Sequence, residues 1–422
     1  MNRFAFLADL FHTAVDAADP RRALADALPE RPKGRTVVIA VGKGAAQMAA
    51  AFEDLWDTPV EGVVVTRYGY GAPRRHLQVI EAAHPVPDEA GARATQAVFD
   101  AVSGLTEDDL VIALICGGGS ALLPAPPEGL TLADEQALNR ELLRSGAPIG
   151  AMNAIRKHVS RIKGGRLALA AHPARVCSLI VSDVPGDDPA QVASGPTVPD
   201  AVGRAQALRM ADAHKIALTE RVMKHLSSDA ASAPDPDDPR FAGNSVRVVA
   251  SARLSLEAAA ARAEAQGIRA AILSDAIEGE ARDIGLMHAA MAREIAARNR
   301  PIAAPVVLLS GGETTVTLGD DPGRGGRNTA FLMSFATAIE GVAGISALAA
   351  DTDGIDGSED NAGAFADGET FPALRRAGHD PAAFAAAQDP YGAFAAAGTL
   401  FAPGPTGTNV NDFRAILIDP QS

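Results

Sequence analysis

The chain has 422 residues, a formal net charge of −14 and a hydrophobic content of 47%. The acidic excess argues against nucleic acid or an anionic membrane as a partner, and the length allows two or three domains with large cores. Only two cysteines are present, Cys116 and Cys177, so we expect neither a disulfide framework nor a cysteine-based metal site.

An amphipathic helix is the first predicted element, within residues 1–20, and it places Leu7, Leu10 and Phe11 on one face. Its apolar stretch contains Asp9 and no small-residue cleavage site follows, so we expect no signal peptide. The sequence also has no apolar run of about 18 residues, the length that spans a bilayer. We therefore expect a cytoplasmic protein without a membrane partner.

A buried strand is predicted at Thr36–Val41, followed by Gly42-Lys43-Gly44 and a helix. This order resembles the first half of a dinucleotide-binding unit, but Gln47 stands where the third glycine of G-x-G-x-x-G is expected. Lys43 lies between two glycines at a strand end, where its ammonium group can bind a phosphate. The alternative is a lysine that merely faces solvent.

Three more strands are predicted to alternate with helices, at residues 62–67, 77–82 and 110–115. This alternation favours an open, mostly parallel α/β sheet with ligands at the carboxyl ends of its strands. The last strand runs into a glycine-rich turn that consists of Gly117, Gly118, Gly119 and Ser120. Exposed backbone N–H groups in such a turn suit a phosphate or carboxylate, and a tight turn without function is the alternative.

Polar residues continue this pattern further along the chain. His84 follows the strand at 77–82, where it can stabilise its loop or contact a substrate. The segment 153–166 is rich in cations and forms either a solvated helix face or an anion-binding edge. Asp183 and Asp187 come directly after a buried strand, which is a common place for a metal ligand or a base.

A stretch rich in Pro, Asp, Ala and Ser, residues 228–243, is the best linker in the chain. It predicts a boundary between an N-terminal domain of residues 1–235 and a C-terminal region of residues 236–422. A new α/β run begins there, with strands predicted at 246–250, 269–274, 306–310 and 345–350, and a half-polar strand in the TTVTL segment.

Glycine-rich and polar loops also follow the predicted strands of the C-terminal region. One of them, Gly323–Asn328, carries Arg327 at a predicted helix start and is typical of an anion site. Asp351 and Asp353 follow the strand at 345–350, but their register does not match a calcium loop. The remaining residues considered for phosphate or substrate binding are Gly311, Gly312, Glu313, Thr314, Gly325, Gly326, Asn409 and Asp412.

Nine short motifs occur in a fixed order over essentially the whole chain. They are GKG at 42–44, HPVPD at 84–88, CGGGSAL at 116–122, SDVPGD at 182–187, ASGPT at 193–197, SGGET at 310–314, GRGGRN at 323–328, DTDGIDG at 351–357 and TGTNVND at 406–412. Together they resemble the class II glycerate kinases, or glycerate 2-kinases, of the MOFRL family. The resemblance implies a Rossmann-like N-terminal domain, a C-terminal α/β region with a MOFRL domain at about 305–418, and an active site in the cleft between the domains.

The resemblance also implies the reaction. Members of the family are ATP-dependent kinases that convert D-glycerate to 2-phosphoglycerate with a divalent cation such as Mg²⁺. Lys43 and Arg327 match the catalytic cations of the family. We expect small-molecule substrates as the only partners, and whether the chain forms a homo-oligomer is left open.

Other roles follow from this expected chemistry. Asp183 and Asp187 are the first candidates for carboxylates near the metal, and Asp351 or Asp353 is the alternative metal ligand or the base for the glycerate hydroxyl. The turn at 117–120 and Arg156 would hold either the glycerate carboxylate or a phosphate. Which glycine loop binds ATP is not decided by the sequence.

The main alternative is an NAD(P)H-dependent hydroxypyruvate reductase, a name that members of this family have also carried. The Gly42–Gly44 turn supports it, and Arg67 at the next strand end suits a 2′-phosphate. Against it are the missing third glycine and the surplus of anion loops, since a dehydrogenase needs one pyrophosphate cradle. A non-catalytic sugar-acid sensor is a third interpretation.

Overall fold

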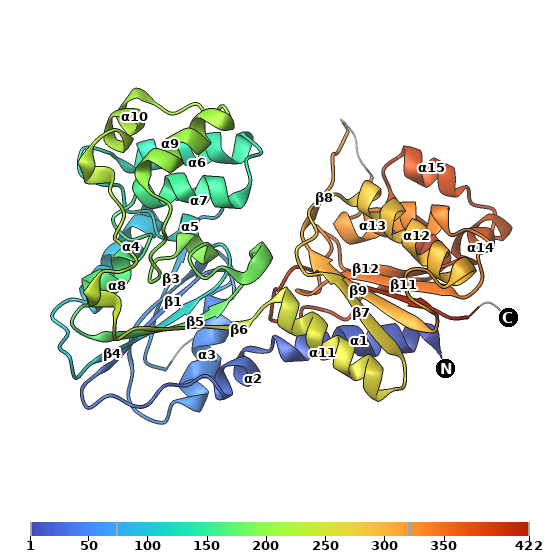
Figure 1. Cartoon of the computed structure of the whole chain (residues 1–422), viewed down its shortest axis with the longest axis horizontal. Coiled ribbons are helices and arrows are strands. Elements are labelled where there is room, and N and C mark those ends of the chain that lie inside the picture. Colours follow the sequence, from blue (N-terminus) through green and yellow to red (C-terminus); the bar gives the residue numbers. More distant parts are fainter. Residues whose placement is uncertain (1, 73–74, 320–322, 421–422) are drawn as a thin grey trace. The chain divides into compact units, whose positions relative to one another are not determined.

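The structure is a computed structural model that describes residues 2–72, 75–319 and 323–420. The chain divides into two compact units. The first, here called the parallel unit, comprises Pro20–Val249, and the second, the mixed unit, comprises the residues up to Asp19 together with those from Ala250 onward (Figure 1).

A six-stranded sheet with the order β3-β2-β1-β4-β5-β6 forms the centre of the parallel unit. Neighbouring strands from β3 to β5 run parallel. The strands are β1 (Thr36–Val41), β2 (Glu61–Arg67), β3 (Gln78–Ala82), β4 (Leu110–Ile115), β5 (Arg175–Val181) and β6 (Ser245–Ala250). Every residue of β1 and β4 is buried, as their continuous apolar sequences predict.

Some helices of the parallel unit cover this sheet, and others pack together in a separate group. They are α2 (Pro20–Ala25), α3 (Ala45–Leu55), α4 (Glu89–Ala101), α5 (Gly119–Leu122), α6 (Leu132–Arg144), α7 (Ile149–His158), α8 (Arg166–Ala171), α9 (Arg204–Ala213) and α10 (Glu220–Leu226). The helices α6, α7, α9 and α10 lie together in Figure 1 and enclose a small core that includes Leu142 and Ile155.

The strand order fixes where the two glycine turns of the parallel unit meet. Successive strands are added on one side of β1 up to β3 and on the other side from β4 onward. Ligands of such sheets bind at this reversal, outside the carboxyl ends of the strands. The turns after β1 and β4 are therefore neighbours, and the predicted Rossmann-like parallel sheet is confirmed.

The mixed unit has a sheet with the order β13-β12-β11-β14-β9-β7 and a separate pair, β8 and β10. Only β7 runs parallel to its neighbour β9 among the described pairs of the larger sheet. The strands are β7 (Arg269–Ser274), β8 (Gly279–Glu280), β9 (Val306–Gly312), β10 (Thr314–Thr315), β11 (Ile345–Asp351), β12 (Gly363–Asp367), β13 (Leu400–Phe401) and β14 (Asp412–Ile418).

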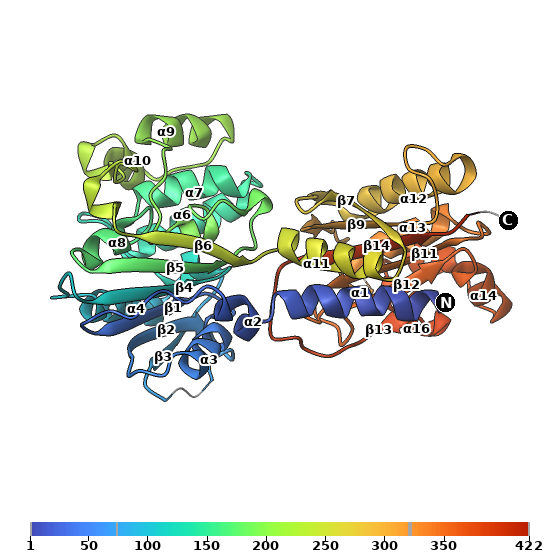
Figure 2. The same ribbon diagram turned by 60° about the horizontal axis from the view of Figure 1, so that its bottom comes forward.

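Helices pack on both faces of this sheet (Figure 2). The helices of the mixed unit are α1 (Arg3–Ala17), α11 (Ala252–Ala265), α12 (Ala281–Arg298), α13 (Arg327–Ala338), α14 (Thr370–Arg376), α15 (Pro381–Ala386) and α16 (Pro390–Ala397). The α1 and α11 helices lie side by side on one face, and α12 and α13 cover the other.

The boundary between the units differs from the predicted division at residues 235 and 236. The first helix belongs to the mixed unit, where Leu7, Leu10 and Phe11 are fully buried. Strand β6 lies next to β5 in the parallel sheet instead of opening the second α/β run. The predicted TTVTL strand is reduced to the two residues of β10.

Amphipathic periodicity predicted α1 and β6 as elements but could not say which sheet each one joins. The described helices include none that is long and apolar enough to cross a membrane. The predicted cleft between domains stays a prediction.

Candidate active site

The backbone N–H groups of the turn after β1 donate hydrogen bonds to acceptors of the protein itself. The N–H groups of Gly42, Lys43 and Gly44 donate to Val65 O at 3.1 Å, Gly117 O at 2.8 Å and Cys116 Sγ at 3.2 Å. A dinucleotide cradle needs such groups for the pyrophosphate. The turn is therefore engaged in holding β1 against its neighbours, and the Lys43 side chain is the group of this turn that stays a predicted ligand contact.

The turn after β4 is approached closely by three polar side chains. A Cβ atom on Gly118 would lie 2.9 Å from Lys43 Cγ and 3.2 Å from His84 Nε2, and one on Gly117 would overlap the Asp183 carboxylate. Gly118 also has a φ of 82°, which a non-glycine residue rarely adopts. Glycine here thus lets Lys43, His84 and Asp183 surround one turn, as the strand-end prediction requires for Lys43 and Asp183.

Positive charge dominates around His84. The pKa of His84 is lowered to about 4, mainly by burial and in addition by the nearby charges of Lys43, Arg67 and Arg156. The ring is therefore neutral at pH 7, with one nitrogen donating and the other accepting. Cations gathered at the carboxyl ends of parallel strands form an environment that attracts an anion.

Most cations of the segment 153–166 have structural partners. Lys157 forms a buried ion pair with Asp200, and Lys163 Nζ donates to Glu135 Oε1 at 3.0 Å. Arg166 donates to three backbone carbonyls. This set is therefore neither a solvated helix face nor a continuous anion-binding edge.

Arg156 is the exception, because it is held by neutral side chains. Its Nε donates to Asn139 Oδ1 at 3.0 Å and its Nη1 to Asn153 Oδ1 at 3.2 Å. Burial lowers the pKa of Arg156 to about 10, so that it stays charged at pH 7. Neutral partners position the guanidinium without cancelling its charge, as a site for a carboxylate or phosphate requires.

The predicted metal ligands are not found as one carboxylate cluster. Within the described residues, no group of three or more His, Cys, Asp or Glu side chains is placed to hold a metal ion. Protein-bound Mg²⁺ commonly takes one or two carboxylates and completes its shell with substrate phosphates and water. Asp183, against the glycine turn, and Asp187, four residues on, fit this partial role.

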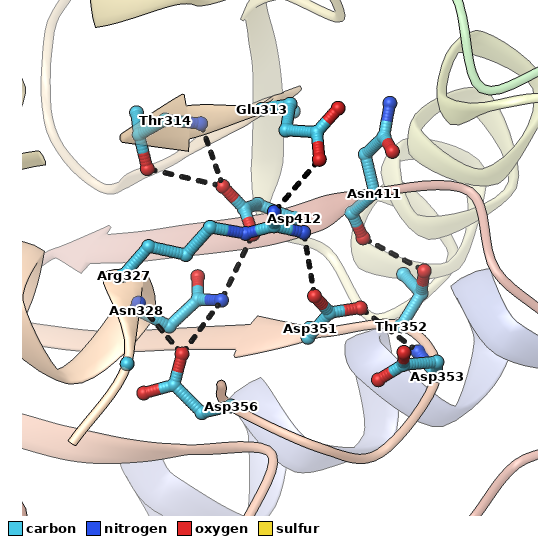
Figure 3. A network of polar contacts seen from close by, with 12 residues as sticks. Glu313, Thr314, Arg327, Asn328, Asp351, Thr352, Asp353, Asp356, Asn411 and Asp412 are labelled. Atoms are coloured by element: carbon cyan, nitrogen blue, oxygen red, sulfur yellow. Dashed lines mark hydrogen bonds and ion pairs between the residues drawn. The ribbon is translucent and has the colours of Figure 1, made fainter. Parts of the chain in front are cut away.

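Asp351 is differently placed, since it belongs to an ion-pair network of the mixed unit (Figure 3). Arg327, the first residue of α13, donates from Nε to Asp412 Oδ1 at 2.6 Å and from Nη2 to Asp351 Oδ2 at 2.6 Å. Its Nη1 donates to Glu313 Oε1 at 2.9 Å. Each nitrogen of the predicted catalytic cation thus has a carboxylate partner.

Burial and charge act on this network in opposite directions. Burial lowers the pKa of Arg327, but Asp412, Asp351 and Glu313 raise it by more, so the guanidinium is firmly charged. Burial raises the pKa of Asp351, and the neighbouring Asp353 adds to this effect while Arg327 opposes it. The network therefore combines the permanently charged Arg327 with several carboxylates that lie close to one another.

Asp412 is the buried centre of the network. Besides Arg327, its carboxylate accepts hydrogen bonds from Asn328 Nδ2 at 2.9 Å and from the backbone and hydroxyl of Thr314. Arg414, which is 1% exposed, forms an ion pair with it from the next inward-facing position of β14. Asp412, predicted as a phosphate-binding residue, thus holds the Arg327 guanidinium from the buried side of the network.

The predicted anion loop at the start of α13 already contains a carboxylate of the chain. Asp356 Oδ1 accepts from Asn328 N at 2.9 Å, and Asp356 Oδ2 accepts from Thr329 N at 2.9 Å and Thr329 Oγ1 at 2.7 Å. A Cβ on Gly326 would overlap Asp356. The first-turn N–H groups are therefore capped internally, and Gly326 makes room for the cap.

Other predicted binding residues also have local structural roles. Gly311 and Gly312 end strand β9 and pair with β14. Asn409 Oδ1 accepts from Asn411 N at 3.0 Å within its own loop. Their roles toward a ligand, and that of Gly325, stay predictions.

Sequence reasoning assigned no role to several residues that the structure brings into the two sites. They are Asn153, Ser194, Asp356 and Arg414. An arginine inside the apolar run of β14 was a visible signal, because a buried charge needs a partner. Asp356 lies in the DTDGIDG motif and Ser194 in the ASGPT motif, and nothing local in these motifs marks either residue as the functional one.

Comparisons with known proteins cover nearly the whole chain. Residues 6–227 match a family model described as a domain of unknown function, DUF4147, and residues 306–412 match the MOFRL family. A protein of Agrobacterium vitis with the provisional name hydroxypyruvate reductase is 50% identical over 97% of this chain and 93% of its own. A D-glycerate 2-kinase of Thermotoga maritima is 37% identical over 97% of both chains.

A solved structure agrees with these sequence matches. The crystal structure of a glycerate kinase from Thermotoga maritima superimposes with a TM-score of 0.88 at 36% identity, and the match covers 98% of this chain and 99% of that one. Sequence and fold are therefore similar along the full length.

Proposed function

Because the chain belongs to the MOFRL family of glycerate kinases, we propose that it transfers the γ-phosphoryl group of ATP to D-glycerate, giving 2-phosphoglycerate and ADP. The observation that carries the proposal is the placement of Lys43 and Asp183 against the Gly117–Gly118 turn, at the reversal point of a parallel sheet. Phosphoryl transfer depends on positioned charge of this kind.

In the parallel unit, Lys43 contacts the transferred phosphoryl group and neutralises the charge that develops on its oxygens. Arg156 binds the carboxylate of glycerate or a phosphate, held in position by Asn139 and Asn153. Asp183 accepts the proton of the attacking hydroxyl or serves as a metal ligand.

In the mixed unit, Arg327 is the second cation of the reaction. Asp412 and Asp351 hold it from the buried side, with side chains 0% and 7% exposed, whereas the Glu313 side chain is 54% exposed. Replacing a buried partner would leave an unpaired charge, but Glu313 can turn into solvent. A phosphate oxygen therefore takes the place of Glu313 at Nη1.

A divalent cation such as Mg²⁺ would supply further neutralisation of the phosphate charge, and Asp183 and Asp187 are the carboxylates that would hold it. Asp351 is a weaker candidate because Arg327 already occupies its Oδ2.

A hydroxypyruvate reductase activity is the alternative that the name of the 50% identical relative raises. The three N–H groups of the Gly42–Gly44 turn already donate to protein acceptors, which argues against a pyrophosphate there. The kinase is therefore the better supported of the two activities.

The test is to incubate the purified protein with D-glycerate and Mg-ATP and to follow ADP release. A parallel sample contains hydroxypyruvate with NADH or NADPH and is followed by nucleotide absorbance. We expect ADP release that depends on D-glycerate. Oxidation of NADH or NADPH without ADP release would overturn the proposal.

A further inference from the structure

Four side chains form a continuous line of hydrogen bonds from α7 to the glycine turn after β4. Arg156 Nη1 lies 3.2 Å from Asn153 Oδ1, and Ser194 Oγ lies 2.9 Å from the same oxygen. Ser194 Oγ lies 2.8 Å from Ser120 Oγ. Asn153 and Ser194 are 2% and 0% exposed, whereas Ser120 is half-buried at the turn that Lys43 approaches.

The line has one direction only. Asn153 Nδ2 donates to the backbone carbonyl of Gln191 at 2.9 Å, and a carbonyl can only accept. The oxygen of this amide therefore faces Arg156 and Ser194, and it accepts a hydrogen from each. Two independent partners thus fix which end of the Asn153 amide is the acceptor.

The order of donors and acceptors is also fixed at Ser194 and at Ser120. A hydroxyl group carries one hydrogen, and Ser194 uses its own in the bond to Asn153. Ser194 must therefore accept from Ser120 in the bond between the two hydroxyls. The Ser120 hydroxyl in turn has its only hydrogen directed at Ser194, so this hydroxyl can offer a ligand nothing but its lone pairs.

The backbone that holds Ser194 is strained. Ala193, Ser194 and Gly195 have φ values of 52°, 60° and 59°, so two residues with side chains stand in the left-handed region. Such strain persists only where the surrounding structure enforces it, and it is concentrated at functional sites. The strained segment delivers the Ser194 hydroxyl to the glycine turn.

We propose that, in the complex with substrate before phosphoryl transfer, this line makes the Ser120 hydroxyl an obligatory hydrogen-bond acceptor for the C2 hydroxyl of the substrate. Any passage of that proton to Asp183 belongs to the later transfer step. Ser120 thereby selects a hydroxy acid over the keto acid of the same carbon skeleton, because a C2 carbonyl brings a second acceptor to the Ser120 lone pairs. A site built to bond a hydroxyl group rejects the analogue that lacks it. The inference rests on the proposed function for the identity of the substrate, D-glycerate.

The test compares dissociation constants of D-glycerate and hydroxypyruvate, which differ at C2. Isothermal titration calorimetry without nucleotide gives both values for wild type, Ser120→Ala and Ser194→Gly. Glycine is chosen at position 194 because it adopts a φ of 60° without strain. We expect wild type to prefer D-glycerate at least about tenfold, and each variant to lose about tenfold of this preference.

Two further variants separate selection from general loosening. Ala193→Gly relaxes the neighbouring strained residue but leaves the hydrogen-bond line intact, so the preference should stay. The double variant Ser120→Ala/Ser194→Gly should lose no more than either single variant, because both remove the same effect.

The inference is contradicted if wild type binds the two acids equally or binds neither. It is also contradicted if both single variants keep the preference, or if Ala193→Gly abolishes it as well. Failure of the proposed function would appear separately, as a lack of ADP release from D-glycerate and ATP, and the calorimetric preference would still decide the role of Ser120.

Discussion

Lys43 carries a flexible cationic side chain on a backbone whose N–H group already donates to another turn. Its N–H donates to Gly117 O at 2.8 Å, which ties the turn after β1 to the turn after β4. The side chain packs against Gly118, so the ammonium group is brought to the edge of the sheet without help from the turn amides. Charge at a fixed position is what phosphoryl transfer uses.

We predict that Lys43→Met lowers the turnover number for ADP release by about 10³-fold, because the methionine keeps the packing but removes the charge. The matched control is Lys33→Met, since the Lys33 side chain is 90% exposed and its ion pair with Asp108 is long, at 4.0 Å. Thermal unfolding of both variants should resemble wild type. Turnover of the Lys43 variant near the wild-type value would refute the assigned role.

His288 makes the stability of the protein depend on pH. It is fully buried, with Nδ1 2.8 Å from Ile284 O and Nε2 2.9 Å from Ser310 Oγ. Burial lowers its pKa to about 4, below the ordinary histidine value of 6.5. Between these two pH values the unfolded chain binds the proton and the folded protein does not, so this contribution is complete above pH 6.5 and is lost as the pH falls toward 4.

The total effect is on the order of 3 kcal/mol. We predict that His288→Gln reduces the slope of the free energy of unfolding against pH between pH 6.5 and 4.5. The reduction corresponds to about one proton and is measured from the urea midpoint at each pH. His379→Gln, at an exposed position, should retain the wild-type slope. Equal slopes for wild type and His288→Gln would exclude His288 as the source.

At the scale of elements, α13 shows how a helix start can serve a side chain. Arg327 is its first residue, and Asp356 caps the two residues that follow. The cap fixes the direction in which α13 leaves its loop, and with it the direction of the Arg327 side chain toward Asp412. The GRGGRN and DTDGIDG motifs are thus partners in one structural unit.

We predict that Asp356→Asn lowers the free energy of unfolding by about 1–2 kcal/mol, because the amide keeps one acceptor but loses the charge and the second acceptor. It should also reduce turnover through misplacement of Arg327. Asp380→Asn is the control, because it makes the same substitution at the cap of another helix. Asp380 caps α15 in the same unit through Ala382 N. An Asp356 variant with wild-type stability would show that the cap is dispensable.

The elements of the parallel sheet could be predicted because their apolar runs are continuous and end at glycine or aspartate. The same rule placed Lys43, Asp183 and the glycine turn at one edge. Strand β6 was assigned to the wrong sheet, since hydrophobic periodicity reports burial and not the neighbouring strand. The antiparallel pairing of the mixed sheet has no local signal either.

The partners of buried polar groups were equally hard to predict. Ser194 and Ser120 are far apart in the sequence, and only the fold brings their hydroxyls to 2.8 Å. Asp356 was read as part of an acidic motif, whereas it caps a helix that begins much earlier in the chain. Residue type and spacing predict which chemistry is present, and tertiary pairing decides which groups remain for a ligand.

At the scale of the whole molecule, the mixed unit is built from both ends of the chain. Phe11 of α1 is fully buried, and its ring centroid lies 5.0 Å from that of Phe401 and 5.8 Å from that of Phe413. Ser255 of α11 also donates to Ala14 O at 2.8 Å. The first helix is therefore part of the core of the C-terminal unit.

We predict that Phe11→Ala destabilises the mixed unit by about 3–5 kcal/mol, because it removes a buried ring and leaves a cavity. Thermal unfolding followed by calorimetry should show one transition shifted and the other unchanged. Leu286→Ala, at a position 42% exposed on α12, should shift neither by much. A shift confined to the transition of the parallel unit would contradict the assignment of α1.

Phosphorylation of the C2 hydroxyl of D-glycerate by ATP is the reaction that we propose for this chain. The most direct measurement is the proton-coupled ³¹P spectrum of the product formed from D-glycerate and Mg-ATP. Phosphate on C2 couples to a single carbon-bound hydrogen and gives a doublet, whereas phosphate on C3 couples to two and gives a triplet. We predict a doublet that appears only when D-glycerate is present; a triplet, or no new phosphorus signal, would overturn the proposed reaction.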